Sequence, residues 1–264
     1  MPAAAPLHDI RPVQTRPAKA VTVGVDGSYW GGLALDWAAC HAWSRGASLR
    51  VLRARDEVPS DVPTDLGLSH AHRLYPLLPI MSRPVGAAPV VDLTTASADS
   101  SLLVLGCRGH RHFGLGDLVI PVLTGARCDV LVVRGTPPAV HGDHRRVTAM
   151  ISGGPDDTLV LRHAAEFAAS RRARLRVVHA APDELRLEPA PEDVLHIAEL
   201  QLKSLALAVR ASFTLARQLP HETVQRLIDT DLVVLATGQS PRHPIGTVTR
   251  TALYHAPCPV LIVR

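Results

Sequence analysis

Aromatic side chains are scarce in this chain of 264 residues, where they make up only 3% of the sequence. Because proteins bind single-stranded nucleic acid largely by stacking bases on aromatic rings, this scarcity argues against that function. The formal net charge is +4, but Lys and Arg form no continuous block of the kind that marks a nucleic-acid-binding arm. We therefore expect no nucleic-acid partner.

Long apolar runs and cysteine motifs are also lacking. No run approaches the roughly 18 apolar residues of a membrane span, and the first 20 residues lack the apolar centre of a secretory signal. The four cysteines form no C-x-x-C pair and no metal-ligand spacing. Cys128 and Cys258 precede apolar runs, where a buried free thiol is the ordinary state. These absences predict a cytoplasmic protein with no membrane partner and no metal site.

Aliphatic residues supply the core instead. Hydrophobic residues make up 47% of the chain and charged residues 20%, which is typical of a globular protein. A core of Val, Leu, Ala and Ile with few aromatics is common where parallel strands are buried on both faces. The composition thus favours an α/β fold.

The chain contains the same unit twice. Residues 101–134 align without a gap on residues 231–264, with 11 of 34 positions identical at an offset of 130. Residues 21–54 match residues 147–180 at an offset of 126, and each segment has the pattern of a strand, an Ala-rich helix and a second strand. The repeat predicts a flexible tail (1–19), a first domain (20–134), a linker (135–145) and a second domain (146–264).

Each domain is expected to hold five strands that alternate with helices, which implies a parallel, doubly wound sheet. Residues 56–78 are predicted to be irregular, although their counterpart has a clear helical pattern. The expected strands are 21–25, 49–54, 79–83, 101–106, 129–133, 147–151, 175–180, 211–217, 231–236 and 259–263. The expected helices are 29–45, 88–97, 116–127, 156–171, 191–209, 221–229 and 246–256.

Two features carry a resemblance to a known family. The first is VGVDGS at the end of the first strand, and the second is LGCRG followed by a glycine-rich loop, a helix and C-x-V-L-V-V-R. Together they resemble the universal stress protein family, as a tandem two-domain member. The resemblance implies two Rossmann-like domains, each a five-stranded parallel sheet with helices on both faces. It also implies a non-catalytic stress-response regulator, with at most weak ATP hydrolysis.

The resemblance places a nucleotide site in the first domain. Nucleotide-binding members carry an Asp after the first strand and G-x2-G-x9-G-[ST] after the fourth, and they bind ATP or AMP, with Mg²⁺ as a companion of ATP. The switch point of an open α/β sheet is a general location for ligands, and Gly116 is expected to begin a helix that offers free amides to phosphate. The site is expected to include Val25, Asp26, Gly27, Ala54, Gly106, Arg108, Gly109, Gly116, Asp117 and Leu118.

This loop departs from the family pattern in two ways. Six residues instead of nine separate Gly109 from Gly116, and Asp117 stands where the hydroxyl residue is expected. A carboxylate about 4 Å from a phosphate charge costs about 1–4 kcal/mol, depending on the local dielectric. Mg²⁺ could bridge the two anions, or Asp117 could serve as an N-terminal helix carboxylate with no ligand. Arg108, His110, Arg111 and His112 would add positive charge, and a ligand-free protein is the alternative.

The second domain keeps less of the pattern. Ser152 replaces the Asp, Ala236 and Gln239 replace the first two glycines, and only Gly246 and Thr247 remain. We expect this domain to be degenerate as a nucleotide site.

Two other functions are considered. One is a nucleotide-free scaffold of the same fold that acts through protein contacts. The other is an adenylating enzyme, because ISGGPDDT (151–158) resembles the SGG-x-D-S loop of ATP pyrophosphatases, although Asp157 replaces the final Ser. A tight turn with Asp156 or Asp157 capping the next helix explains that loop equally.

The last strand of each domain is an apolar edge that needs covering. We expect residues 130–133 and 260–263 to pair with each other within the chain, or with a second chain in a homodimer.

Overall fold

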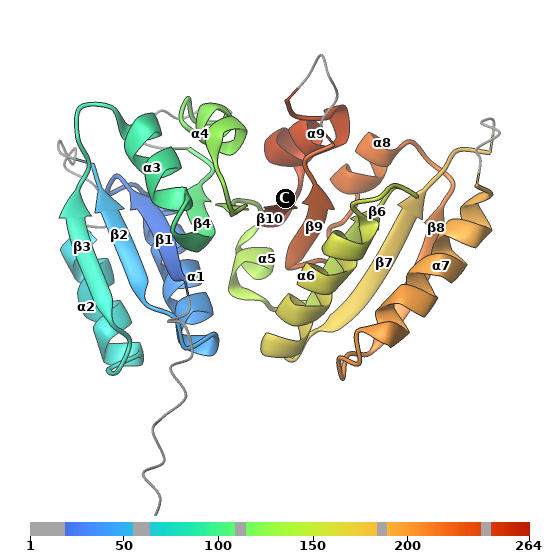
Figure 1. Ribbon diagram of the computed structural model, residues 1–264, viewed down its shortest axis with the longest axis horizontal. Helices are drawn as coiled ribbons and strands as arrows, with labels where there is room; N and C mark the ends of the chain where they lie inside the picture. Colours follow the sequence, from blue (N-terminus) through green and yellow to red (C-terminus); the bar gives the residue numbers. More distant parts are fainter. Residues whose placement is uncertain (1–18, 55–63, 109–114, 184–188, 239–243) are drawn as a thin grey trace, which may run out of the picture.

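A computed structural model describes residues 19–54, 64–108, 115–183, 189–238 and 244–264. In these ranges ten strands form one sheet in the order β3-β2-β1-β4-β5-β10-β9-β6-β7-β8 (Figure 1). The strands are β1 (Ala20–Val25), β2 (Leu49–Arg53), β3 (Ile80–Pro84), β4 (Ser100–Gly106), β5 (Asp129–Val133), β6 (Arg146–Ile151), β7 (Arg174–Ala180), β8 (Ala211–Ala216), β9 (Leu232–Ala236) and β10 (Val260–Val263).

Nine helices cover the sheet in the described part of the chain, and none of them is long and apolar enough to span a membrane. Helices α1, α2, α6 and α7 lie on one face, and α3, α4, α8 and α9 lie on the other (Figure 1). The helices are α1 (Tyr29–Ser44), α2 (Thr64–Leu74), α3 (Pro89–Ser97), α4 (Val119–Gly125), α5 (Pro137–His141), α6 (Asp157–Ser170), α7 (Pro191–Ser204), α8 (Pro220–Gln225) and α9 (Thr247–His255).

The sheet alternates its side chains between two hydrophobic cores. Val21, Val23 and Val25 of β1 face the core under α1, while Leu103 and Leu105 of β4 face the opposite core. This alternation follows from the two-residue period of a strand. It confirms the predicted α/β class with parallel strands and helices on both faces.

The two halves meet through β5 and β10, which pair antiparallel. Every other strand pair in the described sheet is parallel. Within each half the fourth strand lies beside the first, so the chain order reverses between β1 and β4 and again between β6 and β9. Each reversal creates a crevice at the carboxyl ends of the strands.

Two segments differ from the sequence-based prediction. Residues 64–74 were expected to be irregular but form α2, which buries Thr64 and Ala71 and packs Leu68 against the core. The linker contains α5, whose Val140 carbonyl accepts a hydrogen bond of 2.9 Å from the buried Trp37 indole. Tertiary packing thus orders both segments, which their composition did not reveal.

Three helices are shorter than predicted. Helix α4 begins at Val119, three residues after Gly116, and α7 ends at Ser204, five residues before the expected end. Helix α8 ends at Gln225, four residues before its expected end. Residues 1–18, which the predicted tail includes, lie outside the described residues.

Candidate functional site

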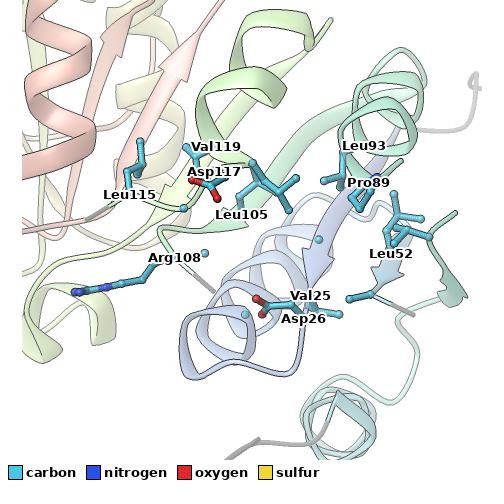
Figure 2. A pocket seen from close by; sticks show the side chains of 17 residues that line it. Val25, Asp26, Leu52, Pro89, Leu93, Leu105, Arg108, Leu115, Asp117 and Val119 are labelled. Carbon is cyan, nitrogen blue, oxygen red and sulfur yellow. The ribbon is translucent and has the colours of Figure 1, made fainter. Parts of the chain in front are cut away.

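A cavity of about 400 Å³ lies at the carboxyl ends of β1 and β4, at the switch point of the first half (Figure 2). Apolar residues form most of its wall, and Asp26, Arg108 and Asp117 add charged groups. The volume falls within the range of small-molecule sites, which are typically apolar with a few placed polar groups. The apolar side chains that line it are Val25, Leu52, Val85, Pro89, Leu93, Leu105, Leu115, Leu118 and Val119.

Most of the residues predicted for the site lie together around this cavity. Gly27 is elsewhere, in a small crevice with Gly32 and Thr64, and Gly109 lies outside the described residues. The predicted residues that line the cavity are Val25, Asp26, Ala54, Gly106, Arg108, Gly116, Asp117 and Leu118.

Sequence reasoning missed Gly24, which also lines the cavity. A Cβ atom at this position would lie 3.0 Å from Leu93 Cδ2 and 3.1 Å from Leu105 Cδ2. A glycine inside a strand often marks a position that a ligand or another part of the chain approaches closely. The glycine in VTVGV could therefore have been predicted to belong to the site. The apolar wall from Leu52, Val85, Pro89 and Leu93 was also missed, because three other elements contribute it.

Asp26 organises the turn between β1 and α1. Its Oδ1 accepts hydrogen bonds from Ser28 N at 3.0 Å and from Ser28 Oγ at 2.6 Å. The same Ser28 Oγ accepts from Gly31 N at 3.1 Å and so caps α1. Gly27 has φ +77°, a left-handed conformation that favours glycine. These bonds fix the Asp26 carboxylate at the rim of the cavity.

The expectation that Gly116 offers a free amide is wrong. Gly116 N donates to the Cys107 carbonyl at 2.8 Å, and its own carbonyl accepts from Val119 N at 3.1 Å. Helix α4 begins only at Val119, with Leu118 as its N-cap residue and no side-chain cap. A hydrogen bond therefore joins the two described ends of this loop, and the Gly116 amide already has an acceptor.

Gly106 has a packing reason to be glycine. A Cβ atom there would lie 2.7 Å from the Trp30 carbonyl carbon and 2.8 Å from its oxygen. This glycine lets the first turn of α1 approach the end of β4.

The charged groups of the described wall are mainly anionic. Asp26 and Asp117 both line the cavity, whereas the Arg108 side chain extends away from the other labelled side chains in Figure 2. The Arg108 guanidinium carbon lies 5.5 Å from the centre of the Trp30 ring. Arg108 thus lines the cavity but holds its guanidinium beside Trp30, and His110, Arg111 and His112 lie outside the described residues.

The corresponding region of the second half carries a larger side chain at one position. Met150 occupies the repeat position of Gly24 and Ile245 that of Leu115, and both are buried in the core on that face of the sheet. Gly246 N donates to the Thr237 carbonyl at 2.9 Å, which repeats the Gly116–Cys107 bond of the first half. Gln239 lies outside the described residues. The two loops thus share this backbone hydrogen bond, but the side chain at the counterpart position in the first strand is larger in the second half.

The SGG loop of the second half binds its own carboxylate. Asp157 accepts from Ser152 N at 2.9 Å and from Gly153 N at 2.7 Å. These are the amides that would hold pyrophosphate in an adenylating enzyme. Asp157 therefore occupies the anion site of this loop, whereas the N-cap residue Asp156 makes no side-chain capping hydrogen bond, so the expected helix cap is not observed.

The four cysteines are free, and three of them are buried. Burial raises the pKa of the Cys128 and Cys258 thiols to about 12, so both are neutral at physiological pH. Among the described residues no three His, Cys, Asp or Glu side chains are arranged to hold a metal ion.

The fold and the cavity define a tandem, doubly wound α/β protein with a ligand-sized crevice at the switch point of its first half. The sequence profile of the universal stress protein family matches residues 144–264. One universal stress protein of Mycobacterium tuberculosis is 26% identical over 270 residues, covering 93% of this chain and 96% of the relative. Another from the same organism is 33% identical over 192 residues, covering 64% and 69%. The chain belongs to the universal stress protein family.

Solved structures agree with the fold. A universal stress protein from Archaeoglobus fulgidus superposes with a TM-score of 0.68 at 16% identity, covering 94% of this chain and 97% of its own. The cytoplasmic domain of a prokaryotic cation chloride cotransporter superposes with a TM-score of 0.60 at 14% identity, covering 93% and 95%. The same overall fold thus occurs in a universal stress protein and in the cytoplasmic domain of a transporter.

Proposed function

We propose that the first half of this protein binds an adenine nucleotide, ATP or AMP, and that the protein acts as a non-catalytic regulator. The observation that carries the proposal is the cavity of about 400 Å³ at the switch point, lined by Gly24. Ligands of open α/β sheets bind at this location. The site comprises the eight predicted residues that line the cavity, together with the apolar wall.

The apolar wall suits a purine ring. Leu52, Pro89 and Leu93 lie near one another in Figure 2, and Val85 and Leu105 also line the cavity. Burial of an aromatic ring against such side chains stabilises a complex by about 25 cal/mol per Å² of apolar surface. The ring system would therefore supply most of the binding free energy.

Asp26 suits the polar edge of a nucleoside. An ionised carboxylate accepts hydrogen bonds and donates none. The exocyclic amino group of adenine and the ribose hydroxyls are donors of the matching kind. Asp26 already uses Oδ1 for Ser28, and the rigid turn fixes the orientation of the carboxylate.

Asp117 sets the requirement for the phosphates. It lines the cavity on the segment that leads into α4, where the family pattern has a hydroxyl residue. The carboxylate of Asp117 and the phosphates of ATP are both negative and repel each other. Mg²⁺ is therefore expected to accompany ATP and to strengthen its binding. AMP, with fewer charges, is expected to depend less on Mg²⁺.

The second half contributes structure instead of a second nucleotide site in this proposal. Met150 is buried at the repeat position of Gly24, and Asp157 occupies the amides of the SGG loop. One nucleotide per chain is therefore the expected stoichiometry.

Calorimetric titration of the purified full chain with AMP, and with ATP in the presence and absence of Mg²⁺, tests the proposal. Asp26→Asn keeps the size of the side chain but removes its charge, and it should weaken binding about tenfold, equivalent to about 1.4 kcal/mol. Asp156→Asn in the second half is the matched control and should leave the affinity unchanged. If no nucleotide produced a heat of binding, the proposal would be refuted and the nucleotide-free scaffold would be favoured. Release of pyrophosphate from ATP would favour the adenylating enzyme.

A further inference from the structure

Arg264, which follows β10 in the second half, reaches a helix of the first half. Its Nη1 donates to the Ala126 carbonyl at 2.8 Å, and its Nη2 donates to the Leu123 carbonyl. Both acceptors lie at the carboxyl end of α4 (Val119–Gly125). A cation at this end of a helix pairs with unsatisfied carbonyls and interacts favourably with the helix dipole.

The opposite end of the same helix walls the cavity. Val119 lines it together with Leu115 to Leu118, which lead into α4. Helix α4 has only seven residues, so a displacement of one end moves the other. Arg264 is further fixed by its backbone N, which donates to Asp129 Oδ1 at 3.2 Å. A residue of the second half thus contacts the end of α4 that lies away from the first-half cavity.

The chain contains a matched arrangement on the other side of the β5–β10 pair. Arg134, the repeat counterpart of Arg264, donates from Nε to Ala256 O and from Nη2 to Tyr254 O, each at 2.9 Å. These carbonyls lie at the carboxyl end of α9 in the second half. Arg134 therefore makes the same kind of contact with a helix that does not wall the first-half cavity.

We propose that Arg264 is a positioning residue for the first-half cavity and that it couples this cavity to the second half. The proposal rests on the proposed function, because the cavity it positions is the nucleotide site. Its premise, that Arg264 holds residues 115–119 in place, can also be tested in the ligand-free protein.

The first test compares nucleotide affinity in Arg264→Ala, Arg264→Lys and Arg134→Ala full-length chains, with AMP and ATP–Mg²⁺ as probes. Arg264→Ala should weaken both nucleotides about five- to tenfold, within the range of residues that couple sites. Arg134→Ala should change the affinity less than about twofold, although it removes three side-chain hydrogen bonds to carbonyls, against two in Arg264→Ala. Arg264→Lys should restore part of the affinity, because an ammonium donates to carbonyls but lacks the planar fork of Arg.

The second test measures amide hydrogen exchange without nucleotide. Residues 115–119, including the hydrogen-bonded amides of Gly116 and Val119, should exchange faster in Arg264→Ala and remain unchanged in Arg134→Ala. A wild-type chain that binds neither nucleotide would refute the proposed function, while the exchange rates would still decide whether Arg264 positions the wall. Unchanged exchange in Arg264→Ala, or equal losses of affinity in both Ala variants, would overturn the inference.

Discussion

Leu131 and Leu261 face each other across the antiparallel pair of β5 and β10. They are also repeat counterparts, because the offset between the two halves is 130 residues there. A pseudo-twofold axis therefore passes between them, and Val130 and Val132 pair with Ile262 and Val260 in the same way. The contact has the self-complementary form of a twofold dimer interface, built within one chain.

This pseudo-symmetry makes differences between the halves informative. Where counterparts are alike, as in Arg134 and Arg264, the structure repeats a contact. Where they differ, as in Gly24 and Met150, a glycine lines the cavity of the first half and a larger side chain is buried in the second. Each half therefore offers controls for the other.

Filling the cavity at Gly24 should abolish nucleotide binding. In Gly24→Met the new side chain would point toward Leu93 and Leu105, whose Cδ2 atoms would lie 3.0 and 3.1 Å from the added Cβ atom. We expect the affinity for AMP to fall more than about tenfold, measured by calorimetry, and stability to fall by about 1–3 kcal/mol through overpacking. Met150→Leu in the second half should keep wild-type affinity at a cost below about 1.5 kcal/mol. Wild-type affinity in Gly24→Met would place the ligand elsewhere.

Gly106→Ala should destabilise the fold more than the reverse substitution, Ala236→Gly, at the counterpart position. The added Cβ would lie 2.7 Å from the Trp30 carbonyl carbon, and backbone cannot move aside as a flexible side chain does. We expect a loss of about 1–3 kcal/mol in the free energy of unfolding, measured by urea denaturation. Ala236→Gly, at the counterpart position, should cost about 0.5–1 kcal/mol through backbone entropy. Equal effects would contradict the packing role of Gly106.

Asp157→Ala should destabilise the second half without altering nucleotide binding. Asp157 is buried, and its carboxylate accepts from the amides of Ser152 and Gly153. Removal of a buried charged acceptor costs about 1–3 kcal/mol, which thermal or urea unfolding would report. Asp156→Ala, at an exposed position with no capping bond, should stay within about 0.5 kcal/mol. Pyrophosphate release by the wild type that disappears in Asp157→Ala would instead indicate adenylating chemistry.

His41 should make the fold sensitive to acid. Burial, followed by the charges of Arg171, Arg45 and His163, lowers the pKa of His41 to about 3, and its ring stacks on Phe167 at 4.6 Å. The unfolded chain binds a proton near pH 6.5, so below that pH protonation favours unfolding. The contribution of His41 is fully present above pH 6.5 and decreases as the pH falls toward 3, by at most about 1.4 kcal/mol per unit.

His41→Phe isolates this effect, because it keeps an aromatic ring against Phe167 and removes the titrating group. Urea unfolding at pH 7, 6, 5 and 4 should show a weaker loss of stability in the variant. Burial raises the pKa of Asp129, which acts with the opposite sign in both proteins and cancels in the comparison. Identical pH dependence would show that His41 titrates normally in the folded state.

Local pattern was sufficient to predict most of the elements. The strands around Val21–Val25 and Asp129–Val133 lie within one residue of their predicted ends, because buried parallel strands are continuous aliphatic runs. The resemblance to the universal stress protein family predicted that Asp26, Gly106 and Asp117 share one site, and all three line one crevice, because the carboxyl ends of neighbouring parallel strands share one edge of the sheet. Whether these residues bind a nucleotide stays a prediction.

Other features depend on partners far along the chain. Helix α5 is ordered by Trp37, which is 103 residues from Val140. The Gly116 amide was expected to be free, and its partner, the Cys107 carbonyl, became evident only when the loop closed.

The sequence by itself determined the repeated α/β unit, since the periodicities of strands and helices are encoded locally, and the family resemblance indicated where the crevice lies. The tertiary structure decided that the repeats join through Leu131 and Leu261 within one chain, and that Arg264 crosses onto α4. It also decided that Gly24 lines a cavity, whereas Met150 is buried in the core. Hydrogen-bond partners and filled volume depend on residues brought together by folding, and no local pattern specifies them.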